Sequence, residues 1–502
     1  MVGSRFALSA YELVNEIKNG SISAEDYIAS MLERIKNMDE RINAYITLNE
    51  HAVEEAKIVD KMVKGYSNGY GNDNGNDDGN SSILLGVPLA VKDNISTQGI
   101  RTTCASKMLE DYVPVYDATV VKRLKDAGAI VIGKTNMDEF GMGSTTEFSA
   151  FGVTHNPWAY ERVTGGSSGG SAAALAACMA SIALGSDTGG SVRCPASFCS
   201  IYGLKPTYGL LSRYGLISYA NSLECIGLMA RSVLDLALML KVTAGGDMQN
   251  DHTSIDADAS LSLDTESMNP DIKGMRFATI REVVESEGID EPVRNSMFDA
   301  ISTVEQLGAI VEEVSIPSSR YALASYYTIA MAEASSNLAR YDGIRYGYTA
   351  EPDGVAWNEF YSTIRSNFGS EVKRRIMLGT YVLSSGYYGR YYMKAQKARA
   401  VIRDDMLKVL KDYDAIMTPT MPILPPRIGE RVSDPLKLYT IDVCTVLANL
   451  AGVPALSIPY SMYNGLPIGV QFMARHLDEP LLLRIAYALE SARGEKVRRC
   501  VI

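Results

Sequence analysis

The chain has 502 residues, of which 46% are hydrophobic and 21% are charged, and its formal net charge is -11. This composition allows a large hydrophobic core and excludes global disorder. A strongly acidic chain is a poor candidate for binding nucleic acid phosphates by itself, although binding through a partner stays open.

The cysteines and histidines indicate neither a disulfide framework nor a metal site. The seven cysteines are odd in number and none forms a C-x-x-C pair, which is typical of a reducing compartment. The four histidines are scattered without ligand spacing, so we expect no metal. The N-terminus shows no targeting signal, and the longest apolar run, residues 172–184, is too short to span a bilayer. We therefore expect a cytoplasmic protein that does not enter membranes.

The first part of the chain, residues 1–65, is predicted to form helices that pack on the outside of a larger body. Ser9 and Ser23 each precede an acidic residue three positions later, which signals the start of a helix. A third helix is predicted over residues 50–64. Residues 66–82 are mostly Asn, Asp, Gly and Ser, and we expect a flexible low-complexity loop without function there.

The body begins at residue 83, and from there strands alternate with helices. Predicted strands cover residues 84–91, 129–133, 275–280, 309–316, 414–418, 455–459 and 468–473. Predicted helices cover residues 118–126, 293–307 and 481–492. This alternation predicts an α/β fold with a largely parallel or mixed sheet. No Pro/Ser linker divides the body, so residues 83–502 are expected to form one domain.

Two glycine-flanked serine turns, residues 164–171 and 185–191, bracket small apolar residues that predict a buried helix and the start of a strand. Glycine permits sharp turns and lets a ligand approach the backbone closely. A serine in such a turn, with neighbouring N–H groups pointing outward, has the parts of a nucleophile and an oxyanion hole. One such turn would be weak evidence, because flexible loops and phosphate-binding loops look similar in sequence. Two of them around one helix are stronger evidence.

Lys92 directly follows the apolar strand at residues 84–91. It could pair with a carboxylate as a structural residue, or burial could lower its pKa so that it acts as a neutral base. The first serine turn also matches G-x-S-x-G, the nucleophile elbow of α/β-hydrolases, whose histidine would have to be His252 or His476. No acid stands in a convincing position for that rival triad. We interpret an S-x-x-K match at Ser370 as accidental, because its context is a charged helix.

Three separated blocks, in order, resemble the amidase signature family. They cover residues 86–93, 165–171 and 185–193. The resemblance extends over nearly the whole chain and implies the amidase signature fold, in which a central mixed β-sheet is covered by helices on both faces, over residues 83–502. That family uses a Ser-cis-Ser-Lys triad. By motif, the lysine is Lys92, the bridging serine after a cis peptide bond is Ser167, and the nucleophile is Ser191.

The resemblance also implies an oxyanion hole and a substrate site. The oxyanion hole would consist of the backbone amides of Thr188, Gly189, Gly190 and Ser191. Within the family, residues 203–209, 332–343 and 374–380 are most similar to A subunits of the Glu-tRNA(Gln)/Asp-tRNA(Asn) amidotransferases. By that likeness, Arg375 binds the α-carboxylate of glutamine and Asp442 binds its α-ammonium. Tyr326 is expected to assist, with Tyr327 as the alternative register.

The resulting hypothesis is a glutaminase subunit that supplies ammonia to a tRNA-dependent amidotransferase. The resemblance implies a heterotrimer with a B subunit, which binds the misacylated tRNA, ATP and Mg²⁺, and a small C subunit; this chain itself would hold no cofactor. The alternative is a stand-alone amidase acting on small amides, and a non-enzymatic scaffold is a distant third. Whether Glu-tRNA(Gln), Asp-tRNA(Asn) or both accept the ammonia stays open. Cys194, Ser200 and Cys225 depart from the residues usual in the family and leave the branch open.

Overall fold

The structure is a computed structural model that describes residues 5–67, 83–256, 268–351 and 354–494. Within these residues, a sheet of eleven strands has the order β1-β3-β2-β6-β8-β7-β12-β13-β11-β9-β10. The strands are β1 Tyr45–Leu48, β2 Pro88–Lys92, β3 Ile130–Thr135, β6 Ile182–Asp187, β7 Tyr202–Lys205, β8 Cys225–Ala230, β9 Arg276–Ile280, β10 Ile310–Val314, β11 Ala415–Pro419, β12 Ala455–Tyr463 and β13 Leu466–Ala474. A separate pair comprises β4 His155–Asn156 and β5 Ala159–Val163.

Helices precede, separate and follow these strands. The α-helices are α2 Ala10–Lys18, α3 Ala24–Ile42, α4 Ala52–Ser67, α5 Thr119–Asp126, α6 Gly169–Ala176, α7 Arg193–Phe198, α8 Val233–Thr243, α9 Arg281–Val284, α10 Glu291–Gln306, α11 Ala322–Leu338, α12 Trp357–Arg365, α13 Ser370–Leu383, α14 Tyr392–Asp412, α15 Pro435–Tyr439, α16 Val446–Ala451 and α17 Glu479–Ala492. Four 3₁₀ turns are η1 Lys107–Leu109, η2 Glu139–Gly141, η3 Pro317–Tyr321 and η4 Thr440–Cys444.

The sheet is mixed and has packed helices on both faces. β2 pairs in parallel with β3 and β6, and β9 with β10 and β11, whereas the remaining pairs are antiparallel. Side chains alternate between the faces of a strand. Accordingly, Leu89 and Val91 join a core cluster with α5, α8, α10 and α17, while Ala90 joins another with α3, α4 and α6. The predicted α/β fold is confirmed.

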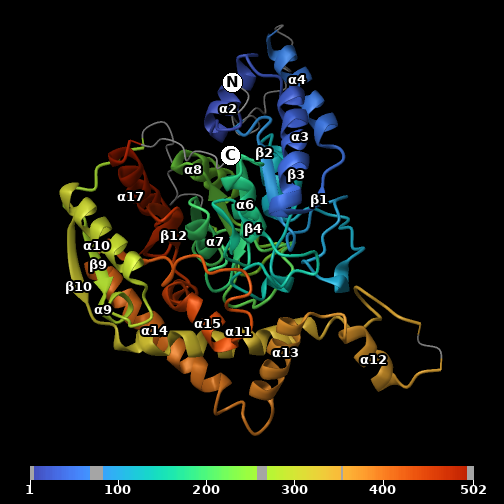
Figure 1. Ribbon diagram of the computed structural model, residues 1–502, viewed down its shortest axis with the longest axis vertical. Helices are drawn as coiled ribbons and strands as arrows, with labels where there is room; N and C mark the ends of the chain where they lie inside the picture. Colours follow the sequence, from blue (N-terminus) through green and yellow to red (C-terminus); the bar gives the residue numbers. More distant parts are fainter. Residues whose placement is uncertain (1–4, 68–82, 257–267, 352–353, 495–502) are drawn as a thin grey trace.

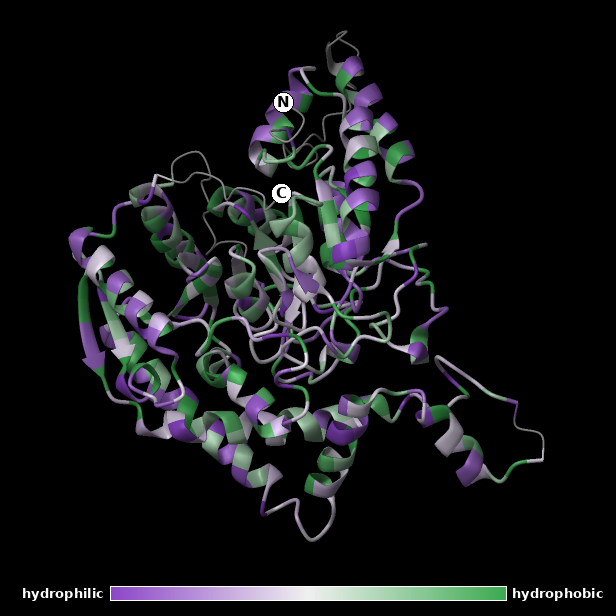
Figure 2. Cartoon of the chain, in the orientation of Figure 1, coloured by the Kyte–Doolittle hydropathy of each residue, from purple (hydrophilic) through white to green (hydrophobic). Residues whose placement is uncertain are grey.

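Two groups of helices lie at opposite ends of the molecule. In Figure 1, α3 and α4 lie at one end, near the edge strand β1, and α11 to α14 lie at the other. Figure 2 shows hydrophobic and hydrophilic residues alternating along the outer helices α3 and α4, as expected for helices that bury one face. The last strand residues of β2 and β6 lie between these ends, and the candidate site is built there.

Several predicted boundaries differ from the observed ones. β1 lies inside the section predicted to be helical, and it pairs with β3 at the edge of the main sheet. α4 continues to Ser67, past the predicted end, and residues 68–82 of the predicted loop lie outside the described residues. The predicted strand over residues 84–91 begins only at Pro88, because the chain first turns at Gly86, whose φ is +73°.

Cys104, Cys194, Cys199, Cys225 and Cys444 are free thiols. Cys178 is disulfide-bonded, which the cysteine pattern did not lead us to expect. No helix in the described part of the chain is both long and apolar enough to cross a membrane. In the same residues, no group of three or more His, Cys, Asp or Glu side chains is arranged to hold a metal ion.

Candidate active site

Lys92 is the last residue of β2, and its side chain is completely buried. Its Nζ lies 2.8 Å from Ser167 Oγ, 2.9 Å from Ser186 Oγ and 3.3 Å from the Ser186 carbonyl oxygen. Asn94 donates a further hydrogen bond to Ser186 Oγ at 3.0 Å. The ammonium end of Lys92 is therefore held between the two serine turns, and no carboxylate contacts it directly among the described residues.

Burial lowers the pKa of Lys92 to about 7, and the more distant carboxylates of Asp138, Asp187 and Glu224 only partly offset this effect. Desolvation penalises the charged form of a lysine. A neutral amine has two N–H donors and one lone pair. The two contacts with Ser186 can use the donors, which leaves the lone pair to accept a proton from Ser167. This environment is therefore suited to a neutral lysine base.

The first serine turn precedes α6, and its Gly166–Ser167 peptide bond is cis. The Ser167 side chain is 1% exposed. The next residue, Ser168, donates its backbone N–H to the Ser191 carbonyl oxygen at 3.1 Å and its hydroxyl to the Ser186 carbonyl oxygen at 3.3 Å. These bonds join the two serine turns. Ser191, at 8% exposure, is the most accessible of the three predicted catalytic residues.

The second serine turn follows β6 and runs from Thr188 to Ser191. Gly190 has a φ of +136°, which favours glycine, and its N–H donates to Asp187 Oδ1 at 2.9 Å. This donor is engaged within the turn, and the oxyanion hole at Thr188, Gly189, Gly190 and Ser191 stays a prediction. The amides of Gly189 and Ser191 donate to no acceptor among the described residues. A Cβ at Gly189 would collide with the Tyr326 ring, so only glycine fits there.

A buried ion pair between Asp187 and Arg193 stabilises the second serine turn. Arg193 donates to both carboxylate oxygens of Asp187, at 3.1 and 2.9 Å, and both side chains are fully buried. Arg193 also donates to Asn449 Oδ1 at 2.7 Å and to the Thr445 carbonyl oxygen at 2.9 Å. The positive charge of Arg193 holds the pKa of Asp187 well below its ordinary value, despite the opposing effect of burial. With every polar atom of the Arg193 guanidinium engaged, the turn has a rigid base.

Arg375, predicted to bind a carboxylate, projects from α13 and is 2% exposed. Its Nε donates to Glu371 Oε1 at 2.7 Å, and one terminal nitrogen donates to the Tyr219 hydroxyl at 2.9 Å. The rings of Tyr219, Tyr327 and Tyr439 surround it, with centroids 5.4–5.5 Å from Cζ. The second terminal nitrogen makes no hydrogen bond to a described residue. A guanidinium held on one side in this way can offer its free N–H groups to a substrate carboxylate.

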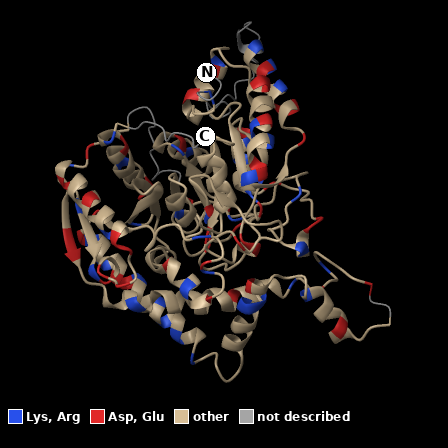
Figure 3. Ribbon diagram, in the orientation of Figure 1, with Lys and Arg blue, Asp and Glu red and all other residues tan. Residues whose placement is uncertain are grey.

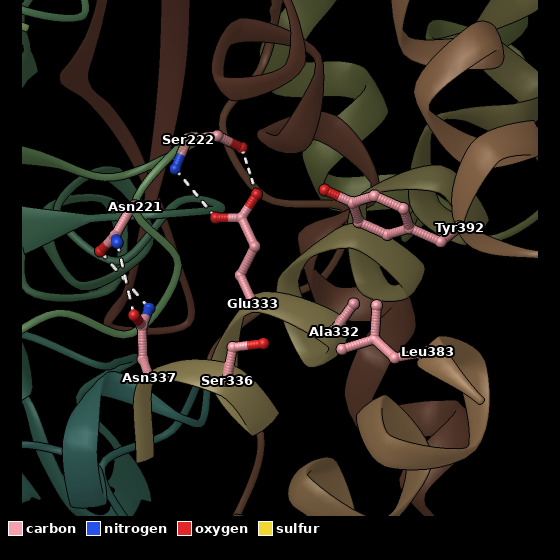
Figure 4. Close-up of a pocket in the computed structure, with 8 residues that line it drawn as sticks. All are labelled: Asn221, Ser222, Ala332, Glu333, Ser336, Asn337, Leu383 and Tyr392. Atoms are coloured by element: carbon pink, nitrogen blue, oxygen red, sulfur yellow. Dashed lines mark hydrogen bonds between the residues drawn. The ribbon is translucent and has the colours of Figure 1, made fainter. Parts of the chain in front are cut away.

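The loop that carries Tyr219 is in turn anchored on α11, beside a pocket of about 220 Å³ shown in Figure 4. Glu333 accepts hydrogen bonds from the Ser222 amide and hydroxyl, at 2.9 and 2.5 Å. Asn337 donates to the Tyr219 carbonyl oxygen at 3.0 Å. Both anchors belong to the 332–343 block, so part of that block positions a partner of Arg375.

Asp442 lies in η4 and is 6% exposed. Its Oδ2 accepts hydrogen bonds from the Tyr327 hydroxyl at 2.5 Å and from Ser144 Oγ at 3.0 Å. Burial raises its pKa to about 6, and the hydrogen bonds and the Arg375 charge oppose that rise. Asp442 thus has one oxygen, Oδ1, without a hydrogen-bond donor among the described residues, as an ammonium ligand would require. Tyr326, the other candidate tyrosine, packs against Gly189 instead.

The family assignment follows from comparison with known proteins. The family described as Amidase matches residues 26–483. The chain belongs to the amidase family. It is 52% identical over 475 residues to the A subunit of the glutamyl-tRNA(Gln) amidotransferase of Methanococcoides burtonii, a match that covers 94% of each chain. The corresponding A subunit of Thermotoga maritima has a similar structure, with a TM-score of 0.78, 42% identity and coverage of 97% of this chain and 95% of that one.

The amidase fold alone does not decide the substrate. The peptide amidase of Stenotrophomonas maltophilia also has a TM-score of 0.78, at 28% identity, and the match covers 98% of each chain. The rival hydrolase triad has no structural counterpart in the described residues. Neither His252 nor His476 forms a hydrogen bond with Ser167, whose hydroxyl pairs with Lys92. At the S-x-x-K match, Lys373 donates to the exposed Ser366 carbonyl oxygen, away from the serine turns.

Sequence reasoning missed the residues that hold this amidase site in place. Glu371 could have been found, because it precedes Arg375 by four residues and that spacing on a helix predicts an ion pair. Tyr327 was named only as an alternative to Tyr326, although the structure gives each a different contact. Tyr219 and Ser144 come from loops and carry no local signal in one sequence.

Proposed function

We propose that this chain is the glutaminase subunit of a glutamyl-tRNA(Gln) amidotransferase. The observation that carries the proposal is the presence of a buried Lys92–Ser167 contact together with two buried side chains of opposite charge, Arg375 and Asp442, each with an unengaged atom. Glutamine has one carboxylate and one ammonium, and each side chain offers a free atom to one of them. The similar proteins are named as A subunits of glutamyl-tRNA(Gln) amidotransferases, which supports the proposed complex.

In the proposed reaction, Ser191 Oγ attacks the side-chain amide carbon of glutamine. Its proton passes to Ser167 Oγ, while the Ser167 proton passes to the neutral Lys92 amine. The amides of Gly189 and Ser191 stabilise the negative charge that develops on the carbonyl oxygen. The same relay returns a proton to the leaving ammonia, and water then hydrolyses the glutamyl ester on Ser191. The products are glutamate and ammonia.

The ammonia is delivered to partner subunits that amidate Glu-tRNA(Gln). We assign ATP, Mg²⁺ and most tRNA contacts to the B subunit, with a small C subunit completing a heterotrimer in the cytoplasm. An acidic chain is suited to such an arrangement, because the partner supplies the phosphate contacts. Asp-tRNA(Asn) is a second acceptor to be tested in the same assay.

The test is to reconstitute the chain with its B and C subunits and to measure formation of Gln-tRNA(Gln) from Glu-tRNA(Gln), ATP, Mg²⁺ and glutamine. Ser191→Ala should lower the glutamine-dependent rate by at least about a thousandfold, as the loss of a nucleophile does in serine hydrolases. The same variant should still use ammonium at high concentration. A wild-type chain that hydrolyses small amides alone but supports no tRNA amidation would favour the stand-alone amidase.

A further inference from the structure

A groove of about 420 Å³ lies between α11 and α14, apart from the candidate active site. On α11 it is lined by Ala324 and Thr328, and on α14 by Lys394, Ala398 and Val401. Positions four and seven apart on a helix lie on one face, so each helix presents one continuous face to the groove. Val401 is 53% exposed. The groove therefore has small side chains on its floor and an uncovered apolar wall.

The surroundings of this groove are cationic, although the chain as a whole is acidic. The residues that line the groove include three basic side chains, Arg390, Lys394 and Lys397, and no Asp or Glu. These three side chains form no salt bridge with any carboxylate in the described ranges. Figure 3 shows basic residues gathered along this part of α14.

We infer that this groove docks an acidic amphipathic segment of a partner subunit. An apolar side chain of the segment would lie over Ala398 and against Val401, and its carboxylates would face Lys394 and Lys397. Helices commonly bind partner proteins by placing an apolar face in such a groove, and complementary charge fixes the register. The inference rests on the proposed function, because only a subunit of a complex has such a partner.

A protein segment fits the groove better than RNA does. Single-stranded RNA binds basic surfaces when aromatic rings are free to stack with bases. Here, the exposed ring of Tyr391 already packs against Tyr387, with centroids 5.7 Å apart, and lies 6.0 Å from Tyr381. Tyr321 also lines the groove and is 58% exposed, so one open ring lies beside the methyl groups of Ala324, Ala398 and Val401. One open ring provides no row of stacking surfaces for successive bases, whereas an apolar side chain packs on the methyl groups while neighbouring carboxylates pair with the lysines.

The experiment uses the reconstituted complex and measures the dissociation constant between this chain and its partner subunits. Lys394→Glu/Lys397→Glu should raise the dissociation constant at least tenfold at low salt, and the difference should shrink at high salt because the charges are exposed. Ala398→Trp should weaken assembly at all salt concentrations, since the new ring fills the groove. The matched control is Lys36→Glu/Lys61→Glu, which makes the same charge change on exposed residues of α3 and α4 at the other end of the molecule.

Carbodiimide coupling of the wild-type complex should join Lys394 or Lys397 to a carboxylate of the partner. Replacing the partner residue that carries this carboxylate with Lys should then restore binding to the charge-reversed variant. Unchanged assembly of both groove variants would overturn the proposal. So would normal assembly with weakened binding of Glu-tRNA(Gln), which would indicate an RNA surface, or loss of a self-dimer, which would indicate a second copy. Failure of the proposed function looks different, because the wild-type chain would then bind no partner and support no tRNA amidation.

Discussion

Glu371 Oε1 accepts hydrogen bonds from Arg375 Nε at 2.7 Å and from the Tyr439 hydroxyl at 2.9 Å. Glu371 is therefore a positioning residue, which holds the guanidinium in one orientation and has no contact with the proposed substrate carboxylate. Its own pKa is below the ordinary value because the Arg375 charge and hydrogen bonds outweigh the opposing effect of burial.

Replacing Glu371 with Gln should weaken glutamine binding without harming the chemistry. The new side-chain amide has the shape of the Glu371 carboxylate but lacks the negative charge that orients Arg375. We therefore expect the KM for glutamine to rise about tenfold. The kcat should stay within about twofold, and ammonium-dependent amidation should be unchanged. Glu313→Gln, which breaks a surface pair with Arg281, is the control. A parallel fall of kcat with both nitrogen donors would show that Glu371 supports folding instead.

Changes at the two side chains proposed to bind glutamine should separate glutamine use from ammonium use. Arg375→Ala and Asp442→Asn each leave one charged end of glutamine unpaired, which costs about 1.5–3 kcal/mol. We expect kcat/KM for glutamine to fall about ten- to hundredfold. Side-by-side assays should show that both variants still amidate Glu-tRNA(Gln) with added ammonium. Equal loss with the two donors would remove these residues from the glutamine site.

Glutamine affinity should fall in mild acid. Burial raises the pKa of Asp442 to about 6, so its carboxylate is ionised above that pH and protonated below it. Only the ionised form attracts the substrate ammonium. The KM for glutamine should therefore rise as pH falls from 7 to 5, and Asp442→Asn should show a high KM without this dependence. A flat KM profile for the unmodified chain would contradict the assignment.

The chemical step should show its own pH dependence, set by Lys92. With a pKa lowered to about 7, the amine is neutral and able to accept a proton only at higher pH. Single-turnover rates should therefore rise with pH through about 7. Lys92→Arg should be inactive at every pH, because guanidinium does not lose its proton in proteins. An active arginine variant would rule out the neutral-amine relay.

The Asp187–Arg193 pair should govern stability as well as activity. Removing one partner of a buried pair leaves the other charge uncompensated, at a cost of about 3–5 kcal/mol. We expect Arg193→Met to lower the free energy of unfolding by that amount in urea titrations. Replacing Arg281, whose pair with Glu313 is half-exposed, should change it by less than about 1 kcal/mol. Similar values for the two variants would contradict the role assigned to the buried network.

Helices and strands could be predicted from the sequence where a periodic pattern or a long motif specifies them. The strand ending at Lys92 and the capped helix after Ser9 are local patterns, and both were found close to their observed positions. β1 was missed because its four residues lie between two strong helices and are stabilised only by pairing with β3. Likewise, β8 shows no alternation because both of its faces are buried.

In the candidate site, too, residues in local motifs could be predicted, whereas residues set by distant contacts could not. The serines and Lys92 stand in long glycine-rich or apolar blocks, so their positions could be read directly. The hydrogen bond from the Gly190 N–H to Asp187 could not be predicted, because it depends on the geometry of the loop. Apart from Glu371, the supports of Arg375 and Asp442 lie far away in the chain, and a single sequence contains no information on which distant segment will meet them.

Thr445 connects the two halves of the proposed site through one short turn. Its hydroxyl donates to the carbonyl oxygens of Gly189, at 2.5 Å, and Asp442, at 3.1 Å. The segment that carries Asp442, the residue proposed to bind the substrate ammonium, and the turn that carries Ser191 are thus joined through one hydroxyl. A substrate held at Asp442 and attacked by Ser191 would therefore meet two groups that are linked through a single side chain.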